Sequence, residues 1–190
     1  MKTAVLTIGD EILSGFTLNT NAAWIGQQLL KIGSEVNTQL TTSDDRLEII
    51  KYLNYLTKER YTHIIVTGGL GPTHDDVTPS AFYEFFGAEP IFDETYWNEL
   101  KTRFAKRNIK IPEKNKNQAV RPNNGNVINN PVGSARGLYF ERDGIKYFAM
   151  PGVPIEMKAM MDSSIIPIIQ DDSHIDIFVK TIRTIGKGES

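Results

Sequence analysis

The feature that most constrains this chain is the alternation of short apolar runs with longer segments of helical period. The run His63 to Thr67 reads His-Ile-Ile-Val-Thr and shows no alternation of polar and apolar residues. Such a strand is typical of a sheet that is covered on both faces. Ala4 to Ile8 and Glu35 to Thr41 are further strand segments. The alternation predicts an α/β domain, a three-layer sandwich around a mostly parallel central sheet.

Helix start and end signals divide the segments between these strands. Ser43 is interpreted as an N-cap, and Thr78, followed by Pro79, predicts another helix start. A cap hydroxyl can accept from free N–H groups, and proline is tolerated at the first helical position. The second of these helices should end near Gly87, and a further helix is expected from Asp93 to Asn108.

The second half of the chain contains an irregular segment and a hairpin signal. Residues 109–135 are rich in Asn, Pro and Gly, so we expect a functional loop there without regular elements. Asp143-Gly144 separates the strand-like segments Gly137 to Glu141 and Ile145 to Met150. This pattern predicts a β-hairpin beside the parallel strands.

Composition limits the classes of protein to which the chain can belong. With 190 residues, of which 40% are hydrophobic, the chain can form one ordinary core. We assign the domain to residues 1–172 and interpret the strand-like tail, residues 173–190, as a linker or the start of a following domain. A net charge of −2 predicts no nucleic-acid or membrane partner. The absence of cysteine and of a signal-like or membrane-spanning segment favours a cytoplasmic protein.

The strongest indication of chemistry is the segment from Gly68 to Asp76, Gly-Gly-Leu-Gly-Pro-Thr-His-Asp-Asp, which follows a buried strand and precedes a helix. Open α/β sheets bind ligands at such loops, and glycine-rich backbone at a helix start suits a phosphate. The segment matches neither the dinucleotide nor the Walker pattern. Asp75 and Asp76 would repel a phosphate unless a cation lay between them, which indicates a divalent metal. The alternative is a glycine-rich turn followed by ordinary helix-start acids.

A second acidic segment, Gly9 to Gly15, directly follows the first strand and should lie at the same edge of the sheet. Adjacent strands would bring Asp10 and Glu11 near Asp75 and Asp76. These side chains could then share one metal ion with the glycine-rich segment. The alternative is that both acids occupy a solvated turn.

Three further segments are candidates for the same cleft. In Asn19-Thr20-Asn21, helix capping is enough to explain Thr20, whereas the role of the two asparagine side chains stays open. Pro151 to Met157 again joins a strand end to a helix start, and its alternative is a rigid turn. Gly133 to Gly137 adds small residues and Arg136, which could meet a phosphate or be a solvated charge.

These segments together resemble the amino-terminal domain of the CinA family (competence/damage-inducible protein), which has the molybdopterin-binding fold of MogA and MoaB proteins. The resemblance covers nearly the whole chain, and one departure is Arg136, where the family usually has proline. Ser134 likewise replaces the family's threonine. The matching segments are Gly9 to Leu13, Asn19 to Asn21, Gly68 to Asp76 with Thr78, Asn117 to Ala119, Asn130 to Gly133 and Pro151 to Met157.

The resemblance implies a metal-dependent ADP-ribose pyrophosphatase that yields AMP and ribose 5-phosphate. It also implies a Co²⁺ or Mg²⁺ ion, with K⁺ as an aid, and a homodimer. Longer members of the family continue into a deamidase, an activity that we do not carry over to this chain. The competing interpretation is a non-hydrolytic binding module for molybdopterin or another phosphorylated ligand, so that the ligand is a nucleotide or a pterin phosphate.

The residues and the resemblance together select a candidate site. The expected catalytic residues are Asp10, Asp75 and Asp76, and the expected metal ligands are these three with Glu11. The expected substrate-binding residues are Gly9, Glu11, Ser14, Gly15, Asn19, Asn21, Gly68, Gly69, Gly71, Pro72, Thr73, Thr78, Gly133, Ser134, Pro151, Gly152 and Glu156.

Overall fold

The computed structural model describes residues 1–73 and 75–172 of the chain. Its strands are β1 (Thr3–Ile8), β2 (Val36–Thr42), β3 (His63–Thr67), β4 (Pro90–Phe92), β5 (Val120–Pro122), β6 (Asn126–Ile128), β7 (Gly137–Arg142) and β8 (Ile145–Met150). Its helices are α1 (Asp10–Leu13), α2 (Thr20–Lys31), α3 (Arg46–Lys58), α4 (Thr78–Phe86), α5 (Glu94–Ala105), α6 (Pro154–Met160) and α7 (Ile166–Asp172). A 3-10 helix, η1 (Glu113–Ala119), and a π-helical turn, η2 (Met161–Ile165), complete the set.

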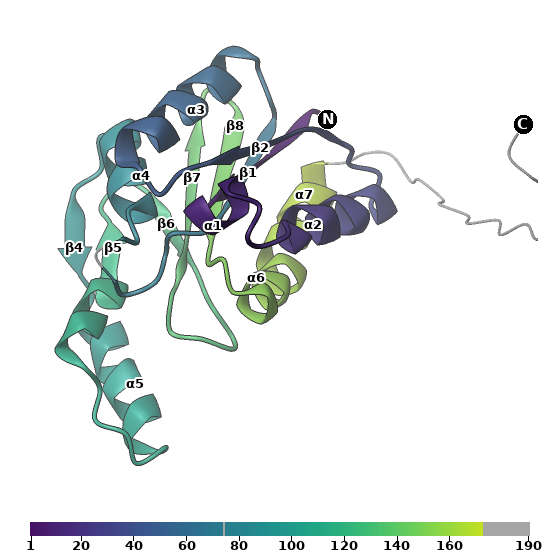
Figure 1. Ribbon diagram of the computed structural model, residues 1–190. Coiled ribbons are helices and arrows are strands. Elements are labelled where there is room, and N and C mark those ends of the chain that lie inside the picture. The colour runs from purple at the N-terminus through teal and green to yellow at the C-terminus, as the bar shows by residue number, and fades with distance from the viewer. Residues whose placement is uncertain (74, 173–190) are drawn as a thin grey trace, which may run out of the picture.

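The main sheet has the strand order β2-β1-β3-β8-β7-β6 (Figure 1). β3 pairs in parallel with β1 on one side and with β8 on the other, and its continuous apolar run is buried along its whole length. β2 is parallel to β1, whereas β7 and β6 are antiparallel to their neighbours. β2 and β3 therefore lie on opposite sides of β1, so the direction in which successive strands are added to the sheet reverses at β1. Ligands of open α/β sheets bind at this kind of reversal.

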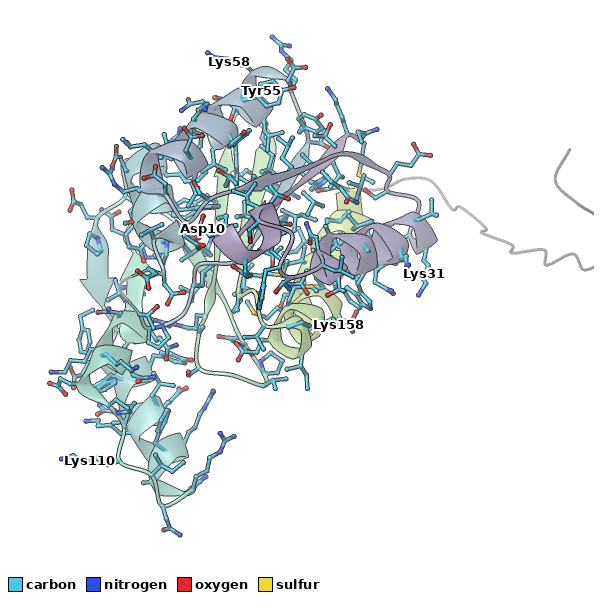
Figure 2. The ribbon with its side chains drawn as sticks, viewed as in Figure 1. Asp10, Lys31, Tyr55, Lys58, Lys110 and Lys158 are labelled. Carbon is cyan, nitrogen blue, oxygen red and sulfur yellow. The ribbon has the colours of Figure 1, made fainter. Side chains whose placement is uncertain are left out.

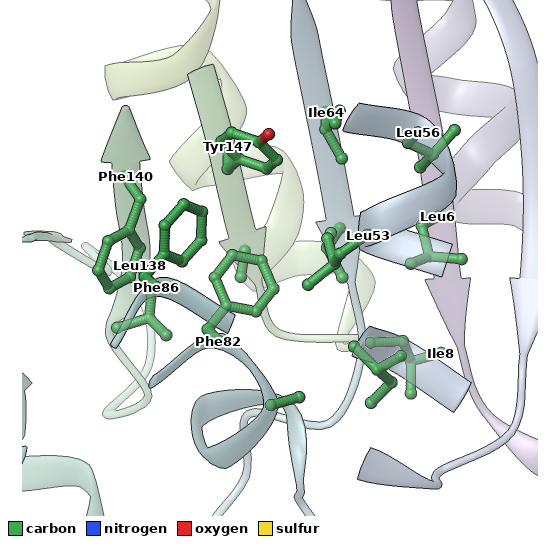
Figure 3. Packing of buried hydrophobic residues seen from close by; sticks show 14 of the residues in the cluster. Leu6, Ile8, Leu53, Leu56, Ile64, Phe82, Phe86, Leu138, Phe140 and Tyr147 are labelled. Carbon is green, nitrogen blue, oxygen red and sulfur yellow. The ribbon is translucent and has the colours of Figure 1, made fainter. Parts of the chain in front are cut away.

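Helices cover both faces of the sheet, which confirms the three-layer architecture (Figure 1). Alternate residues of β1 point to opposite faces. Leu6 belongs to a core formed with α3 and α4, and Val5 belongs to a core formed with α2, α6 and α7. Figure 3 shows the first core, in which Phe82 and Phe86 of α4 lie against Phe140 of β7. Burial of these rings fixes α4 directly after the glycine-rich segment.

Residues 109–135 are more regular than we expected. They contain η1, β5 and β6, and β5 forms a small antiparallel ribbon with β4. α5 and η1 share a separate apolar cluster that includes Trp97 and Leu100, and they extend from the main body (Figure 1). The expectation failed because each of these short elements depends on a partner elsewhere in the chain, which local composition does not reveal.

Three predicted helix caps are corrected by the structure. Asp45, not Ser43, caps α3 by accepting from the backbone N–H groups of residues 47 and 48. Asn19, not Thr20, caps α2. Thr78 is the first residue of α4, and its hydroxyl donates to the carbonyl of Gly68 at 2.9 Å. α3 begins at Arg46 and α2 at Thr20, so the capping positions fall on Asp45 and Asn19. The buried Thr78 hydroxyl donates to a carbonyl instead.

The predicted hairpin is confirmed. β7 and β8 pair through Arg142 and Ile145, and the two turn residues Asp143 and Gly144 both have positive φ, as this tight turn requires. In the part of the chain that is described, no helix is both long and apolar enough to span a bilayer. The strand-like tail predicted for residues 173–190 lies outside the described residues.

Candidate functional site

A cleft of about 450 Å³ lies at the carboxyl ends of β1, β3 and β8. We call it the edge cleft. It gathers the loops that follow these three strands, together with parts of η1 and of the loop before β7. The edge cleft is lined by Ile8, Gly9, Glu11, Asp44, Gly68, Gly69, Leu70, Gly71, Pro72, Asp76, Asn115, Gln118, Ser134, Ala135, Pro151, Gly152, Val153 and Glu156.

The glycines after β3 are required by the packing of their own loop. Gly68 has φ +118°, and a Cβ there would collide with the backbone carbonyl of Ile8. Gly69 has φ +65°, and a Cβ there would collide with the hydroxyl of Thr78. The loop after β3 can therefore approach β1 and α4 closely only because these two side chains are absent.

Asp76 holds the glycine-rich loop in shape. Its Oδ1 accepts from the backbone N–H of Gly71 at 2.7 Å, and its Oδ2 accepts from the backbone N–H of Thr73 at 2.8 Å. The Thr73 hydroxyl also donates to Oδ2, at 2.5 Å. Both oxygens of a residue that we expected to bind metal are thus engaged within the loop.

The same bonds identify which N–H groups remain for an anion. The N–H of Gly68 donates to the carbonyl of Met150, and those of Gly71 and Thr73 donate to Asp76. The N–H groups of Gly69 and Leu70 have no partner within the described residues. Within residues 68–73, these two are the N–H donors that remain for a phosphate.

An acidic residue that the sequence analysis missed lies between the predicted ones. Asp44 follows β2, lines the edge cleft and accepts from the backbone N–H of Asp10 at 3.0 Å. Partial burial raises the pKa of Asp44, and the negative charges of Asp10, Glu11 and Asp76 raise it further, against that hydrogen bond. Of the four acids that we expected to converge, Glu11 and Asp76 line the edge cleft with Asp44, whereas Asp10 and Asp75 do not. The signal for Asp44 was its place after the second strand, at the same edge of the sheet.

The carboxylates do not form a preorganised metal site. Among residues 1–73 and 75–172, no three Asp, Glu or His side chains lie close enough together to hold an ion. Asp10, labelled in Figure 2 at the start of α1, and Asp75 are exposed and line none of the cavities described here. The oxygen donors nevertheless suit a hard divalent ion, provided that phosphate oxygens and water complete its shell.

The Asn19-Thr20-Asn21 segment, at the start of α2, is hydrogen-bonded to residues at the ends of the strands that form the cleft. Asn19 Nδ2 donates to the hydroxyl of Thr7 at 2.9 Å. Asn21 Nδ2 donates to the carbonyl of Gly152 at 2.8 Å and to the hydroxyl of Thr67 at 3.3 Å. Both amides line a small hollow of about 130 Å³ that also reaches Glu11. They connect α2 to the ends of β1, β3 and β8.

Asn130 makes similar connecting hydrogen bonds between the long loop and α6. Its Oδ1 accepts from the N–H groups of Val132 and Gly133, and its Nδ2 donates to Glu156 at 2.7 Å. Glu156 and Ser134 line the edge cleft, and together with Gly133 they also line a neighbouring hollow of about 490 Å³. Asn130 therefore fixes a segment of the long loop against α6.

The structure brings most of the predicted binding residues to one place. Those lining the edge cleft are Gly9, Glu11, Gly68, Gly69, Gly71, Pro72, Asp76, Ser134, Pro151, Gly152 and Glu156. Thr78 is buried behind the loop, and Ser14 and Gly15 are exposed on the turn after α1. Besides Asp44, Asn115 lines the edge cleft without having been predicted from the sequence, and it lies in the segment that we expected to be irregular.

A comparison with protein families matches residues 4–171 to the family described as "Probable molybdopterin binding domain". Among curated proteins, the chain is 38% identical to a CinA-like protein of Salinibacter ruber and 37% identical to one of Flavobacterium psychrophilum. In each case the match covers 100% of this chain and 46% of the relative. The chain thus spans about half the length of these relatives.

Solved structures of related proteins superpose on this chain. The CinA protein of Thermoplasma acidophilum, whose function is described as unknown, superposes with a TM-score of 0.76 at 34% identity, covering 88% of this chain and 97% of that one. The tungsten cofactor synthesizing protein MoaB of Pyrococcus furiosus superposes with a TM-score of 0.56 at 18% identity, covering 90% and 95%. At that identity the second likeness concerns the fold alone.

Proposed function

This chain belongs to the CinA-like proteins within the family of probable molybdopterin-binding domains, and from that premise we propose that its edge cleft binds a phosphorylated nucleotide and hydrolyses its pyrophosphate, with ADP-ribose as the substrate. One observation carries the proposal. Glu11, Asp44 and Asp76 line the same cleft as the glycine-rich loop. Carboxylates beside an anion site are stable there when a cation is bound between them and the anion.

Each part of the cleft has a role in this mechanism. The N–H groups of Gly69 and Leu70 bind one phosphate, because within residues 68–73 they are the N–H donors without a partner. Asp76 keeps that loop in position through its bonds to Gly71 and Thr73. Glu11 and Asp44 would hold a divalent ion, Co²⁺ or Mg²⁺. The chemistry that such an ion supplies when bound is neutralisation of phosphate charge and a lower pKa for coordinated water. K⁺ assists the divalent ion in this proposed hydrolysis.

The test compares AMP release from ADP-ribose by the wild type, Asp44→Asn and Glu11→Gln, each with Co²⁺ or Mg²⁺. These substitutions keep the shape of the side chain and remove its charge, so we expect kcat to fall by about 100-fold or more. Asp162→Asn is the matched control, because Asp162 is an exposed carboxylate outside the cleft. Equal turnover in all four proteins would refute the assignment of the two carboxylates.

The variant Asp76→Asn tests whether Asp76 acts by holding the glycine-rich loop in position. The amide can replace only one of the two acceptor oxygens, so we expect a raised KM together with a lowered kcat. Absence of AMP release by the wild type with every metal would refute hydrolysis itself.

The second candidate is a non-hydrolytic binding module for molybdopterin or another phosphorylated ligand. The observation in its favour is the engagement of both Asp76 oxygens within the loop, which leaves fewer carboxylates for a metal. Tight binding of a pterin phosphate without turnover across several metals would support this candidate over the first.

We extend the proposal to a homodimer. Phe16 and Leu18, on the turn between α1 and α2, are 91% and 80% exposed, which is unusual for large apolar side chains and supports a contact there. Light scattering of the purified chain and of Phe16→Ser measures the assembly. A monomeric wild type would refute the dimer.

A further inference from the structure

The hollow next to the edge cleft has no role in the mechanism above, and we call it the basic hollow. Its volume is about 490 Å³, and its walls come from the end of α5, from residues 131–134 and from Glu156. Ser134 and Glu156 also line the edge cleft, so the two spaces adjoin. A group attached to a ligand in the edge cleft can therefore extend into the basic hollow.

Cations dominate the charge of the basic hollow. Arg103, Lys106 and Arg107 line it, and Glu156 is the one carboxylate among its walls. The basic hollow therefore has a net charge of +2, although the whole chain has a net charge of −2. A concave surface lined by one sign of charge concentrates counter-ions. The space beside the edge cleft thus favours an anion.

The position of these cations at the end of a helix explains them only in part. Lys and Arg near a helix C-terminus are stabilised by the helix dipole, and α5 ends at Ala105. Lys101 and Lys110 belong to the same arm, residues 94–119, which extends from the main body in Figure 1, and neither lines the basic hollow. The helix dipole does not require three cations to share one hollow beside the edge cleft. The shared hollow needs a further explanation, and an anionic ligand provides one.

Two of these cations are free to bind a ligand. The side chains of Lys106 and Arg107 make no hydrogen bond or ion pair within residues 1–73 and 75–172. Arg103 is more restrained, because its Nη2 lies 3.8 Å from Glu99 and its Nη1 donates to the carbonyl of Gly133 at 3.5 Å. Arg103 therefore shapes the wall, and Lys106 and Arg107 can contact the ligand.

Charge and size select the kind of anion. A phosphate monoester has a charge of about −1.5 to −2 at pH 7 and three acceptor oxygens, which suits the net charge of the basic hollow. Arg107 can bind two of these oxygens with paired N–H groups, and Lys106 can act as a point charge. Glu156 opposes an anion, but its Oε2 already accepts from Asn130 Nδ2 at 2.7 Å. The volume exceeds that of a phosphate, so a sugar can accompany it.

We propose that the basic hollow binds a phosphate monoester that is separate from the pyrophosphate in the edge cleft. ADP-ribose itself has no such group, because both of its phosphates belong to the pyrophosphate. The monoester can come from two sources. It is either a third phosphate on a ribose hydroxyl of an ADP-ribose ligand, or a separate phosphate ion that binds beside ADP-ribose. The inference rests on the proposed function for one point only, the place of the pyrophosphate in the edge cleft.

A nuclear magnetic resonance titration of the full chain with inorganic phosphate, at an ionic strength held constant with chloride, tests the site itself. We expect saturable shifts of the backbone amides in residues 103–107 and 132–134. The double variant Lys106→Gln, Arg107→Gln should weaken this binding by about tenfold or more, because both unpaired charges are lost. The matched control is Lys101→Gln, Lys110→Gln, which removes the same charge from the same arm outside the basic hollow (Lys110 is labelled in Figure 2).

Calorimetry with ADP-ribose and ADP-ribose 2′-phosphate, in the presence of EDTA so that neither is cleaved, identifies the source of the monoester. If the monoester belongs to the ligand, ADP-ribose 2′-phosphate should bind the wild type at least about tenfold more tightly than ADP-ribose, and Lys106→Gln, Arg107→Gln should remove that preference. Equal binding of the two nucleotides, together with saturable phosphate binding, would assign the basic hollow to a separate phosphate ion.

Two results would overturn the proposal. One is the absence of saturable shifts in residues 103–107 and 132–134. The other is phosphate binding that Lys106→Gln, Arg107→Gln weakens no more than the control variant does. Phosphate binding is measured without turnover, so either result leaves the proposed hydrolysis untouched. Absence of AMP release with intact phosphate binding would refute the hydrolysis alone.

Discussion

Asp76 is bonded twice to Thr73, from whose backbone N–H it accepts at 2.8 Å and from whose hydroxyl it accepts at 2.5 Å. A third bond, from the N–H of Gly71, occupies the other carboxylate oxygen. The shape of the glycine-rich loop therefore depends on an acid at its end.

This relationship predicts that Asp76→Ala loosens the loop. We expect amide hydrogen exchange of a peptide covering residues 68–73 to accelerate about tenfold or more. Hydrogen bonds to a charged group contribute about 1.5–3 kcal/mol, and 1.4 kcal/mol corresponds to tenfold. Mass spectrometry measures the exchange, and Asp162→Asn is the control. Unchanged protection of the loop would show that other contacts hold it.

Two glycines with positive φ should respond differently to alanine. At Gly87 nothing lies within 4 Å of an added Cβ, so Gly87→Ala should cost only the left-handed backbone penalty, about 1–2 kcal/mol. Gly68→Ala adds a collision with the backbone carbonyl of Ile8, which cannot move without shifting β1. Urea denaturation should show a clearly larger loss of unfolding free energy for Gly68→Ala. Similar losses for the two variants would mean that the backbone of β1 yields easily.

The aromatic core behind the glycine-rich loop should dominate local stability. Phe82 is fully buried, and its ring centre lies 5.9 Å from that of Phe86 and 6.1 Å from that of Phe140. Phe82→Ala should lower the free energy of unfolding by about 3–5 kcal/mol. Leu47→Ala, on the exposed side of α3, should change it by less than about 0.5 kcal/mol. A small effect at Phe82 would imply that the core collapses around the gap.

A charged cluster at the opposite end of the sheet should make stability depend on pH. Asp172 accepts from Lys146 at 2.7 Å and interacts with His63 Nε2 at 2.8 Å. Burial acts to raise the pKa of Asp172, but these hydrogen bonds outweigh it, so the pKa lies below its usual value. Burial also lowers the pKa of His63, although Asp172 opposes that shift.

Both pKa values are depressed in the folded state, so both groups stabilise the fold above their unfolded pKa values and lose that effect as pH falls. For His63 the loss begins below about pH 6.5, and for Asp172 below about pH 3.9. Asp172→Asn should lower the free energy of unfolding by about 1–2 kcal/mol at pH 7, and its difference from the wild type should shrink below pH 4. Nuclear magnetic resonance titration should also show a further decrease in the pKa of His63. Asp171→Asn, on the exposed neighbour, is the control, and equal effects of the two variants would contradict the prediction.

The sequence by itself determined the layers of the fold and the sheet edge at which the candidate site lies. The continuous apolar run of β3 predicted a strand that is covered on both faces, and Asp143-Gly144 predicted the hairpin of β7 and β8. The loops after β1 and β3 could be placed at one edge because parallel neighbours end on the same side. These properties follow from the periodicity of short segments, which a single chain displays directly.

Only the tertiary structure decided what the individual residues of the candidate site contact. Asp44 enters the cleft because β2 pairs with β1, and Nε and Nη2 of Arg136 have no hydrogen-bond partner among the described residues because this side chain is buried between Asp93 and Tyr96. Thr78 donates to Gly68 because the close approach of the loop presents that carbonyl to its hydroxyl. Each of these outcomes is a contact between residues that are separated in the chain, and such contacts depend on how the elements pack and not on local periodicity.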